Sequence, residues 1–149
     1  MVKPPAIDER EFLKLTRNHG EFCDKLRTLG YTAASADLIE IAQHIGLSWP
    51  RLAHEHLNDG RAAEKATSSR ASYSRSYYAV YNASKAVRYI VSGMVSLKTD
   101  DHKDASELPD DFPDVEKWTD AIIKFKEHRL RADYDNWIAD AIRTFPHIG

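Results

Sequence analysis

The 149-residue sequence predicts an all-α protein, and three observations support that fold class. Apolar residues recur at spacings of three and four along most of the chain, which is the period of a helix with one buried face. Runs of strict alternation between β-branched and polar residues, typical of half-buried strands, are absent from the sequence. Most glycines and prolines lie between the periodic segments, where they mark helix ends. A chain of this length is expected to form one domain with short extensions.

The first predicted helix covers residues 8–29, and the second covers residues 35–45. Gly30 and Gly46 follow their last periodic residues, as expected of helix stops. Gly20, inside the first helix, leaves open a division into two. The apolar stripes are Phe12, Leu15, Phe22 and Leu26 in the first helix, and Leu38, Ile41, Ala42 and Ile45 in the second.

The third helix is expected to start near Trp49 and Pro50 with Ser48 as its N-cap, because proline is tolerated in a first turn. The longest helix is predicted over residues 63–94, followed by a loop over residues 98–113 that is rich in aspartate and proline. The last helical region is expected from about residue 113 toward Phe145. The predicted core face of the longest helix, at spacings of three and four, is Val80, Ala83, Val87, Ile90 and Met94.

Charge is unevenly distributed along the chain. Residues 61–98 contain seven basic side chains and one acid, whereas residues 99–120 contain nine acids and two lysines. This pattern indicates either a binding surface with its own acidic screen or two solvated regions that neutralise each other. The formal net charge of -2 gives no reason to expect a general attraction to nucleic acid.

Several classes of protein are disfavoured by simple sequence features. The single cysteine, Cys23, cannot form an intrachain disulfide, and the N-terminus lacks the apolar region of a secretory signal. The apolar run "YIVSGMVSL" is too short to span a bilayer, so a cytoplasmic location without membrane association is expected. The sequence has neither a glycine-rich phosphate loop nor ligand-like Cys/His spacing, so we expect no cofactor and no metal.

A polar stripe runs along the longest predicted helix, well over 90° from its predicted core face. Tyrosine interleaved with arginine, asparagine and lysine suits a flat, polar ligand such as RNA. The alternative is that Tyr77, Tyr78 and Tyr81 pack against neighbouring helices with their hydroxyls at the rim. The stripe consists of Arg75, Tyr78, Asn82, Lys85 and Tyr89.

The last helix carries an arginine where its pattern requires an apolar residue. Continuing the stripe of Val115, Trp118, Ile122 and Phe125 leads to Arg129 and then to Asp133. An arginine on such a face must be paired, or must face a ligand or a second subunit, since an unpaired buried charge is costly. Asp133, four residues later, is the natural partner. A paired arginine that only orients a helix crossing remains the alternative.

Two segments together resemble the small bacterial HEPN-domain family. "SRSYYAVYNASKAVRYI" is similar to the family's central-helix pattern RxYYAxFHAAxAL, with Asn82 where that pattern has histidine. "HRLRADYDNW" is similar to its later signature LRxxADYD, and "DDHKD" places His102 where the family often has a Ser-His-Lys loop. The resemblance covers residues 49–137. The matching residues are Arg75, Tyr77, Tyr78, Ala79, Ala83, Ala86, Arg129, Ala132, Asp133, Tyr134 and Asp135.

The resemblance implies an antiparallel bundle of four to five helices over residues 48–149, preceded by an N-terminal helical extension over residues 1–47. It also implies a homodimer, and often a nucleotidyltransferase-type antitoxin as partner in toxin–antitoxin or phage-defence systems. Many members of the family are metal-independent ribonucleases. Their catalytic pattern is an arginine followed by a histidine, and it maps onto Arg129 and Tyr134, where tyrosine replaces the usual histidine. Asp133 would orient Arg129 in such a site.

Because of that replacement, enzymatic activity is left open. The first expectation is a module that binds RNA, a nucleotide or a protein partner through Arg75, Tyr78, Asn82 and His102. One alternative is an endoribonuclease with Arg129 at a dimer cleft, and another is a purely structural bundle. "EIAQHIGLSWPRLAHEHL" is also similar to a helix-turn-helix, but lysine and arginine are scarce in residues 31–50, so DNA binding is disfavoured.

Overall fold

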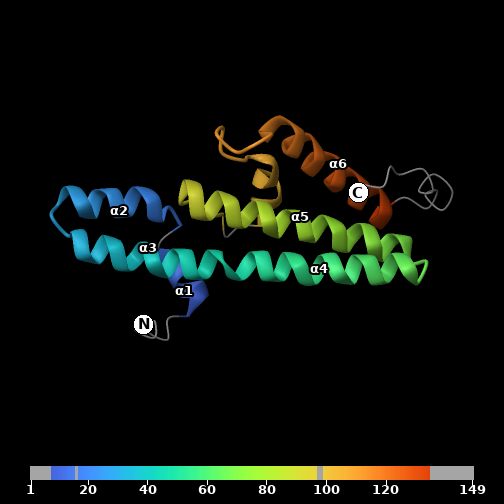
Figure 1. The fold of residues 1–149 in the computed structure, drawn as a ribbon, viewed down its shortest axis with the longest axis horizontal. Coiled ribbons are helices and arrows are strands. Elements are labelled where there is room, and N and C mark those ends of the chain that lie inside the picture. The colour runs from blue at the N-terminus through green and yellow to red at the C-terminus, as the bar shows by residue number, and fades with distance from the viewer. Residues whose placement is uncertain (1–7, 16, 97–98, 135–149) are drawn as a thin grey trace.

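The computed structural model describes residues 8–15, 17–96 and 99–134, and within them it contains helices but no strand (Figure 1). This confirms the predicted all-α class. Two short 3-10 helices, η1 (Thr99–His102) and η2 (Asp104–Ser106), precede the last helix. The α-helices are α1 (Glu9–Leu15), α2 (His19–Thr28), α3 (Thr32–Gly46), α4 (Ser48–Lys65), α5 (Ser69–Ser92) and α6 (Val115–Tyr134).

Helices α3–α6 pack together as a bundle. Figure 1 shows α3 and α4 following one another along the long axis, joined through Leu47, which keeps right-handed helical angles (φ −73°, ψ −10°). Helix α2 lies beside α3, α5 lies beside α4, and α6 lies against α5. A helix-turn-helix needs two helices that cross at roughly 90–120°. The nearly continuous path of α3 and α4 does not form one.

The first predicted helix is divided into α1 and α2 by a contact with the end of α5. In the connection between them, the Arg17 carbonyl accepts a hydrogen bond of 3.0 Å from the Val95 N–H, and Asn18 forms an isolated antiparallel bridge with Met94. Backbone groups engaged in this way cannot also continue a helical ladder. Helix α2 then restarts because the Asn18 side chain accepts a hydrogen bond of 3.1 Å from the Glu21 N–H.

Gly93 ends α5 and lets these two segments approach closely. Its φ of +70° lies in the left-handed region that favours glycine, and its N–H donates to the Tyr89 carbonyl at 3.0 Å. A Cβ atom at this position would lie 2.6 Å from the nitrogen of Gly20. The backbones of two glycines therefore meet in direct contact where α2 passes the end of α5.

The expected helix over residues 63–94 is wrong at its start. Helix α4 ends at Lys65 and α5 begins at Ser69, with a tight turn between them. Thr67 adopts a φ of 59° in this turn, and the Ser68 N–H donates to the Ala63 carbonyl at 2.8 Å. This bond satisfies a carbonyl at the end of α4, so the helix closes where periodicity alone predicts continuation.

Ser48 does not act as the expected N-cap. Its hydroxyl donates to the carbonyl of Ile45 at 2.7 Å, and Leu47 occupies the N-cap position without a side-chain cap. The hydroxyl therefore satisfies the end of α3 and leaves the start of α4 uncapped. This arrangement follows from the short junction, since only one residue separates the two helices.

The predicted core face of α5 is also wrong. Ala83 is exposed, Met94 is 54% exposed, and Val80, Val87 and Ile90 are only partly buried. Helix α5 packs against α3 and α4 and also against α6 and η2, so it is covered on several sides. Polar side chains are buried there because they find partners. The buried residues of α5 are Tyr77, Ala79, Asn82, Ser84, Ala86, Arg88 and Tyr89.

The main hydrophobic core lies where α1, the α3–α4 junction and the end of α5 meet. The predicted stripe of α3 is confirmed, because Ala42 and Ile45 are buried in this core and Leu38 and Ile41 pack against it. Burying such side chains contributes about 1.5–3 kcal/mol for each large apolar residue. The buried cluster consists of Phe12, Leu13, Ala42, Ile45, Trp49, Ala86, Tyr89 and Val95.

Helix α6 begins close to its predicted position, and the predicted loop before it contains η1 and η2. On its predicted apolar stripe Ile122 is 4% exposed and Phe125 is partly buried, whereas Trp118 is 43% exposed. The predicted continuation toward residue 145 lies outside the described residues. At Arg129 the stripe still faces α5, because the guanidinium lies against Tyr78, and Asp133 pairs with Arg129 on the same helix.

We expect the protein to lose stability in mild acid because His19 is buried at the junction between α2 and α5. His19 is 5% exposed, its ring meets Tyr89 edge-on at 4.5 Å, and burial lowers its pKa below the ordinary 6.5. Below pH 6.5 the unfolded chain binds a proton that the folded chain resists, so the free energy of unfolding falls with pH. The slope is at most about 1.4 kcal/mol per pH unit for one histidine.

Denaturant unfolding at pH 7.5 and 5.5 measures this loss. His19→Phe keeps a ring against Tyr89 but removes the titration, so the loss between the two pH values should shrink. His54→Gln is the matched control, because His54 is exposed on α4. An equal loss in the wild type and in His19→Phe would show that His19 does not carry the effect.

Candidate functional site

His102 is held against α5 by three tyrosines. It is the last residue of η1, and its Nδ1 atom lies 2.9 Å from the Tyr77 hydroxyl in a hydrogen bond. Its ring stacks on Tyr81 with the centroids 4.2 Å apart, and it meets Tyr78 edge-on at 6.0 Å. The three tyrosines fall within little more than one turn of α5, so a single short stretch of helix fixes the imidazole.

Arg129 reaches the same tyrosines from α6. Its guanidinium carbon lies 5.6 Å from the ring centroid of Tyr77 and 5.5 Å from that of Tyr78, within the range of a cation–π contact. Its Nη2 atom donates to the Tyr78 hydroxyl at 3.5 Å. Its Nε atom lies 2.9 Å from Oδ2 of Asp133 as an ion pair, but without a well-directed hydrogen bond. The two charged side chains are 23% and 28% exposed, so a ligand in solution has access to them.

A second arginine, Arg75 of α5, is connected to this surface through His56 of α4. Arg75 is exposed, and its Nη1 atom lies 3.3 Å from Nδ1 of His56. The His56 ring in turn lies 5.6 Å from the ring of Tyr78. Contacts therefore run from Arg75 through His56 and Tyr78 to Arg129. We call the whole group the His102–Arg129 cluster: His56, Arg75, Tyr77, Tyr78, Tyr81, His102, Arg129 and Asp133.

Two of the predicted site residues lie apart from this surface. Asn82 is 6% exposed, and its side-chain amide donates to the Tyr78 carbonyl of its own helix at 2.8 Å. It therefore supports α5 and does not face a ligand. Tyr134 is the last residue of α6 and is 76% exposed. The cluster thus contains Arg75, Tyr78 and His102 from the predicted set, together with Arg129 and Asp133.

A buried ion pair lies directly beneath His102. Asp101 is 2% exposed and pairs with Arg88 at 3.2 Å, and it also accepts hydrogen bonds from the Tyr81 hydroxyl and, at 3.3 Å, from the Ser96 N–H. Burial alone would raise the pKa of this carboxyl. The hydrogen bonds from Tyr81 and Arg88, together with the charge of Arg88, outweigh burial and leave the pKa below its ordinary value.

The hydrogen-bonded pair of His102 and Tyr77 is uncharged near pH 7. Burial lowers the pKa of His102 below 6.5, and the charge of Arg129 lowers it further. Burial raises the pKa of Tyr77 to about 12, so this hydroxyl keeps its proton. It can donate to Nδ1 of His102, which leaves the ring proton on Nε2. The positive charge closest to this uncharged pair is then that of Arg129.

Sequence reasoning missed the supporting residues of the cluster. Tyr77 and Tyr81 read as packing residues, and nothing in helical periodicity connects Asp101 or Lys126 to a site. Lys126 donates to the His102 carbonyl at 3.0 Å, which ties η1 to α6. The sequence contains one signal of this buried support. Arg88 lies within a run of α5 residues that are otherwise small or apolar, which indicates a buried arginine that needs a partner.

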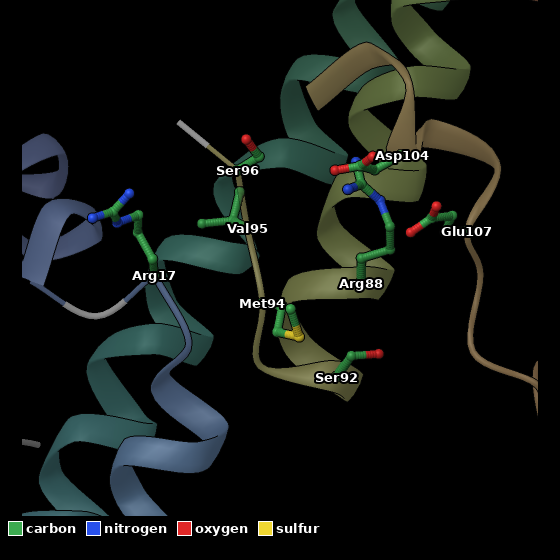
Figure 2. Close-up of a pocket in the computed structure, with 8 residues that line it drawn as sticks. All are labelled: Arg17, Arg88, Ser92, Met94, Val95, Ser96, Asp104 and Glu107. Atoms are coloured by element: carbon green, nitrogen blue, oxygen red, sulfur yellow. The ribbon is translucent and has the colours of Figure 1, made fainter. Parts of the chain in front are cut away.

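A cavity of about 360 Å³ lies on another side of Arg88, between the α1–α2 connection and η2. Figure 2 shows Arg17 pointing away from the Arg88, Asp104 and Glu107 side chains, which lie on the opposite side of the cavity. Charged groups that do not converge on one point give a small ligand few simultaneous contacts. The His102–Arg129 cluster, whose side chains do converge, is the stronger candidate.

The fold and the cluster define an all-α protein with a partly exposed aromatic and basic surface between α4, α5 and α6. No protein-family model, curated protein or solved structure matches this chain. Within the part of the chain that the structure describes, no group of three or more histidine, cysteine or acidic side chains is placed to hold a metal ion. Across the same residues, no helix is both long and apolar enough to cross a membrane.

Proposed function

We propose that the chain is a HEPN-like module that binds single-stranded RNA, or a nucleotide with the same groups, at the His102–Arg129 cluster. The observation that carries this proposal is the guanidinium of Arg129 lying against Tyr77 and Tyr78 while it is still partly exposed. The two sequence segments that resemble the HEPN family contribute these three residues from separate helices. Their meeting supports the proposal.

The chemistry of the cluster suits an unpaired nucleotide. An arginine can bind a phosphate through several charge-assisted hydrogen bonds. Arg129 contacts Tyr78 directly, and Arg75 is connected to it through His56. Aromatic rings and imidazole provide stacking surfaces for bases that are not paired in a duplex. The neutral His102 ring adds hydrogen bonding without repelling a cationic neighbour. In this proposal Asp133 orients Arg129.

Other parts of the proposal rest on the family resemblance. They are a homodimer with the cluster at its cleft, a nucleotidyltransferase-type antitoxin as partner, and a role in toxin–antitoxin or phage defence. An antiparallel HEPN-like arrangement of α4, α5 and α6 belongs to the same proposal. The extended path of α3 into α4 and the scarcity of basic residues there give no support to DNA binding.

Binding of fluorescein-labelled single-stranded RNA, followed by anisotropy, tests the proposed function. Arg129→Ala should weaken binding about 10- to 100-fold, because a hydrogen bond to a charged group is worth about 1.5–3 kcal/mol. Arg131→Ala is the matched control, since Arg131 is an exposed arginine on the same helix. Equal affinity in Arg129→Ala and the wild type would contradict the proposal. If the wild type does not bind RNA and Arg129→Ala loses much of its thermal stability, the result would favour a structural bundle.

A second candidate function is a metal-independent endoribonuclease, favoured by one observation. His102 contacts the same two tyrosines as Arg129, so an imidazole lies within the cluster although Tyr134 replaces the family's usual histidine. A neutral imidazole of lowered pKa can handle a proton at neutral pH. RNA cleavage in EDTA that is lost in both His102→Ala and Arg129→Ala would support this candidate. Binding without turnover would support the non-catalytic module.

A further inference from the structure

Besides the contacts of His102 itself, the 3-10 segment is anchored through Asp101, the residue beside it. Asp101 accepts three sets of hydrogen bonds, from the guanidinium of Arg88, the hydroxyl of Tyr81 and the N–H of Ser96. The Asp101 and Arg88 side chains are only 4% and 8% exposed. A carboxylate with this many donors, shielded from water, is held in one position much more firmly than an exposed one.

Tyr81 couples this anchor to the ring of His102. Its hydroxyl donates to Asp101, and its aromatic face stacks on His102 at a centroid distance of 4.2 Å. One side chain of α5 therefore contacts two consecutive residues of η1. Because adjacent Cα atoms are only about 3.8 Å apart, we expect a movement of Asp101 relative to Tyr81 to change the stacking of His102 as well.

We infer that Asp101 is a positioning residue for the candidate site: the buried Asp101–Arg88 pair, through Tyr81, sets His102 against α5 and so prepares the cluster for its ligand. Asp101 itself is too deeply buried to touch that ligand. The meaning of this role for binding rests on the proposed function. The placement of His102 is a property of the free protein and can be measured without any RNA.

NMR titration of the His102 imidazole in the free protein tests the inference. The charged groups that affect its pKa are Arg129, Asp101, Lys126 and Lys85. Burial is the largest influence and lowers the pKa, whereas the negative charge of Asp101 raises it. In Asp101→Asn, loss of positioning and loss of charge therefore predict opposite shifts of the His102 pKa. Loss of positioning exposes the ring and moves the pKa up toward 6.5, whereas loss of charge alone moves it further down.

Tyr81→Phe provides a second, gentler variant if Asp101→Asn does not fold. It removes the hydroxyl that reaches Asp101 but keeps the ring that stacks on His102. We expect the His102 pKa to move up toward 6.5 and the nuclear Overhauser contacts between His102 and residue 81 to weaken. Asp110→Asn is the control, because it removes an exposed acid from the same connection between α5 and α6.

An unchanged His102 pKa in Tyr81→Phe, or a downward shift with intact ring contacts in a folded Asp101→Asn, would overturn the inference. RNA anisotropy on the same variants separates this result from the proposed function. If positioning holds and the cluster binds RNA, Tyr81→Phe should weaken binding several-fold while Asp110→Asn does not. The two proposals can also separate. If the variants raise the His102 pKa toward 6.5 but the wild type does not bind RNA, the positioning role of Asp101 would stand and the proposed function would be rejected.

Discussion

Replacing Arg88 by methionine is expected to lower the free energy of unfolding by about 3–5 kcal/mol, the cost of breaking one buried ion pair. Methionine fills a similar volume, but it leaves the carboxylate of Asp101 buried without its cation. The remaining donors, the Tyr81 hydroxyl and the Ser96 N–H, cannot neutralise that charge. Urea unfolding monitored by circular dichroism measures the difference, with an unchanged slope indicating that only stability has changed.

The double variant Arg88→Met/Asp101→Asn identifies the cause of this loss. Asparagine can still accept a hydrogen bond from Ser96 and can donate to the Tyr81 oxygen, but it carries no charge. We therefore expect the double variant to be more stable than Arg88→Met alone. If the double variant is instead less stable by the sum of the two single losses, the pair is not coupled and the destabilisation comes from lost packing.

Gly93→Ala is the second substitution for which a large effect is expected, about 2–5 kcal/mol. A non-glycine residue in the left-handed region costs about 1–2 kcal/mol, and forced overpacking costs about 1–3 kcal/mol more. The new Cβ would lie 2.6 Å from the Gly20 nitrogen and 2.7 Å from the Gly20 Cα, both backbone atoms that cannot rotate away. The junction between α2 and the end of α5 must therefore open.

Gly30→Ala separates the two contributions to this cost. Gly30 has a φ of +88°, but a Cβ there would meet nothing within 4 Å. It should lose only the conformational part, about 1–2 kcal/mol. Thermal unfolding of both variants measures the difference between them. Equal destabilisation at the two positions would mean that the close approach of Gly20 and Gly93 contributes nothing.

Helical periodicity predicts a helix well where its buried positions are apolar and lie on a single stripe. The stripe of α3 is such a case, since Ala42 and Ile45 enter the core as expected. Periodicity fails on α5, where several elements cover the helix and buried positions carry Arg88 and Asn82. Whether a polar side chain can be buried depends on partners that are distant in the sequence, and the spacing of apolar residues contains no information about them.

Part of the candidate site can likewise be predicted from helical periodicity, and part depends on contacts between residues that are distant in the sequence. The mismatch between Arg129 and its apolar stripe is visible in the sequence, because one helix carries both the pattern and the exception. The contribution of His102 depends on the path of η1, which is set by the contacts of Asp101 with α5 and with Ser96. The break between α1 and α2 arises in the same way, from hydrogen bonds to residues that follow α5.

The bridge between Asn18 and Met94 has a consequence for the order of events on the ribosome. Helix α1 and the α1–α2 connection are translated well before Met94, which bridges Asn18 of that connection, and before Tyr89 and Val95, which share the core with α1. At ~5–20 residues per second the delay is on the order of 4–15 s. Phe12 and Leu13 lack their contacts with Tyr89 and Val95 during that interval, so complete docking of α1 is expected to be a late step of co-translational folding.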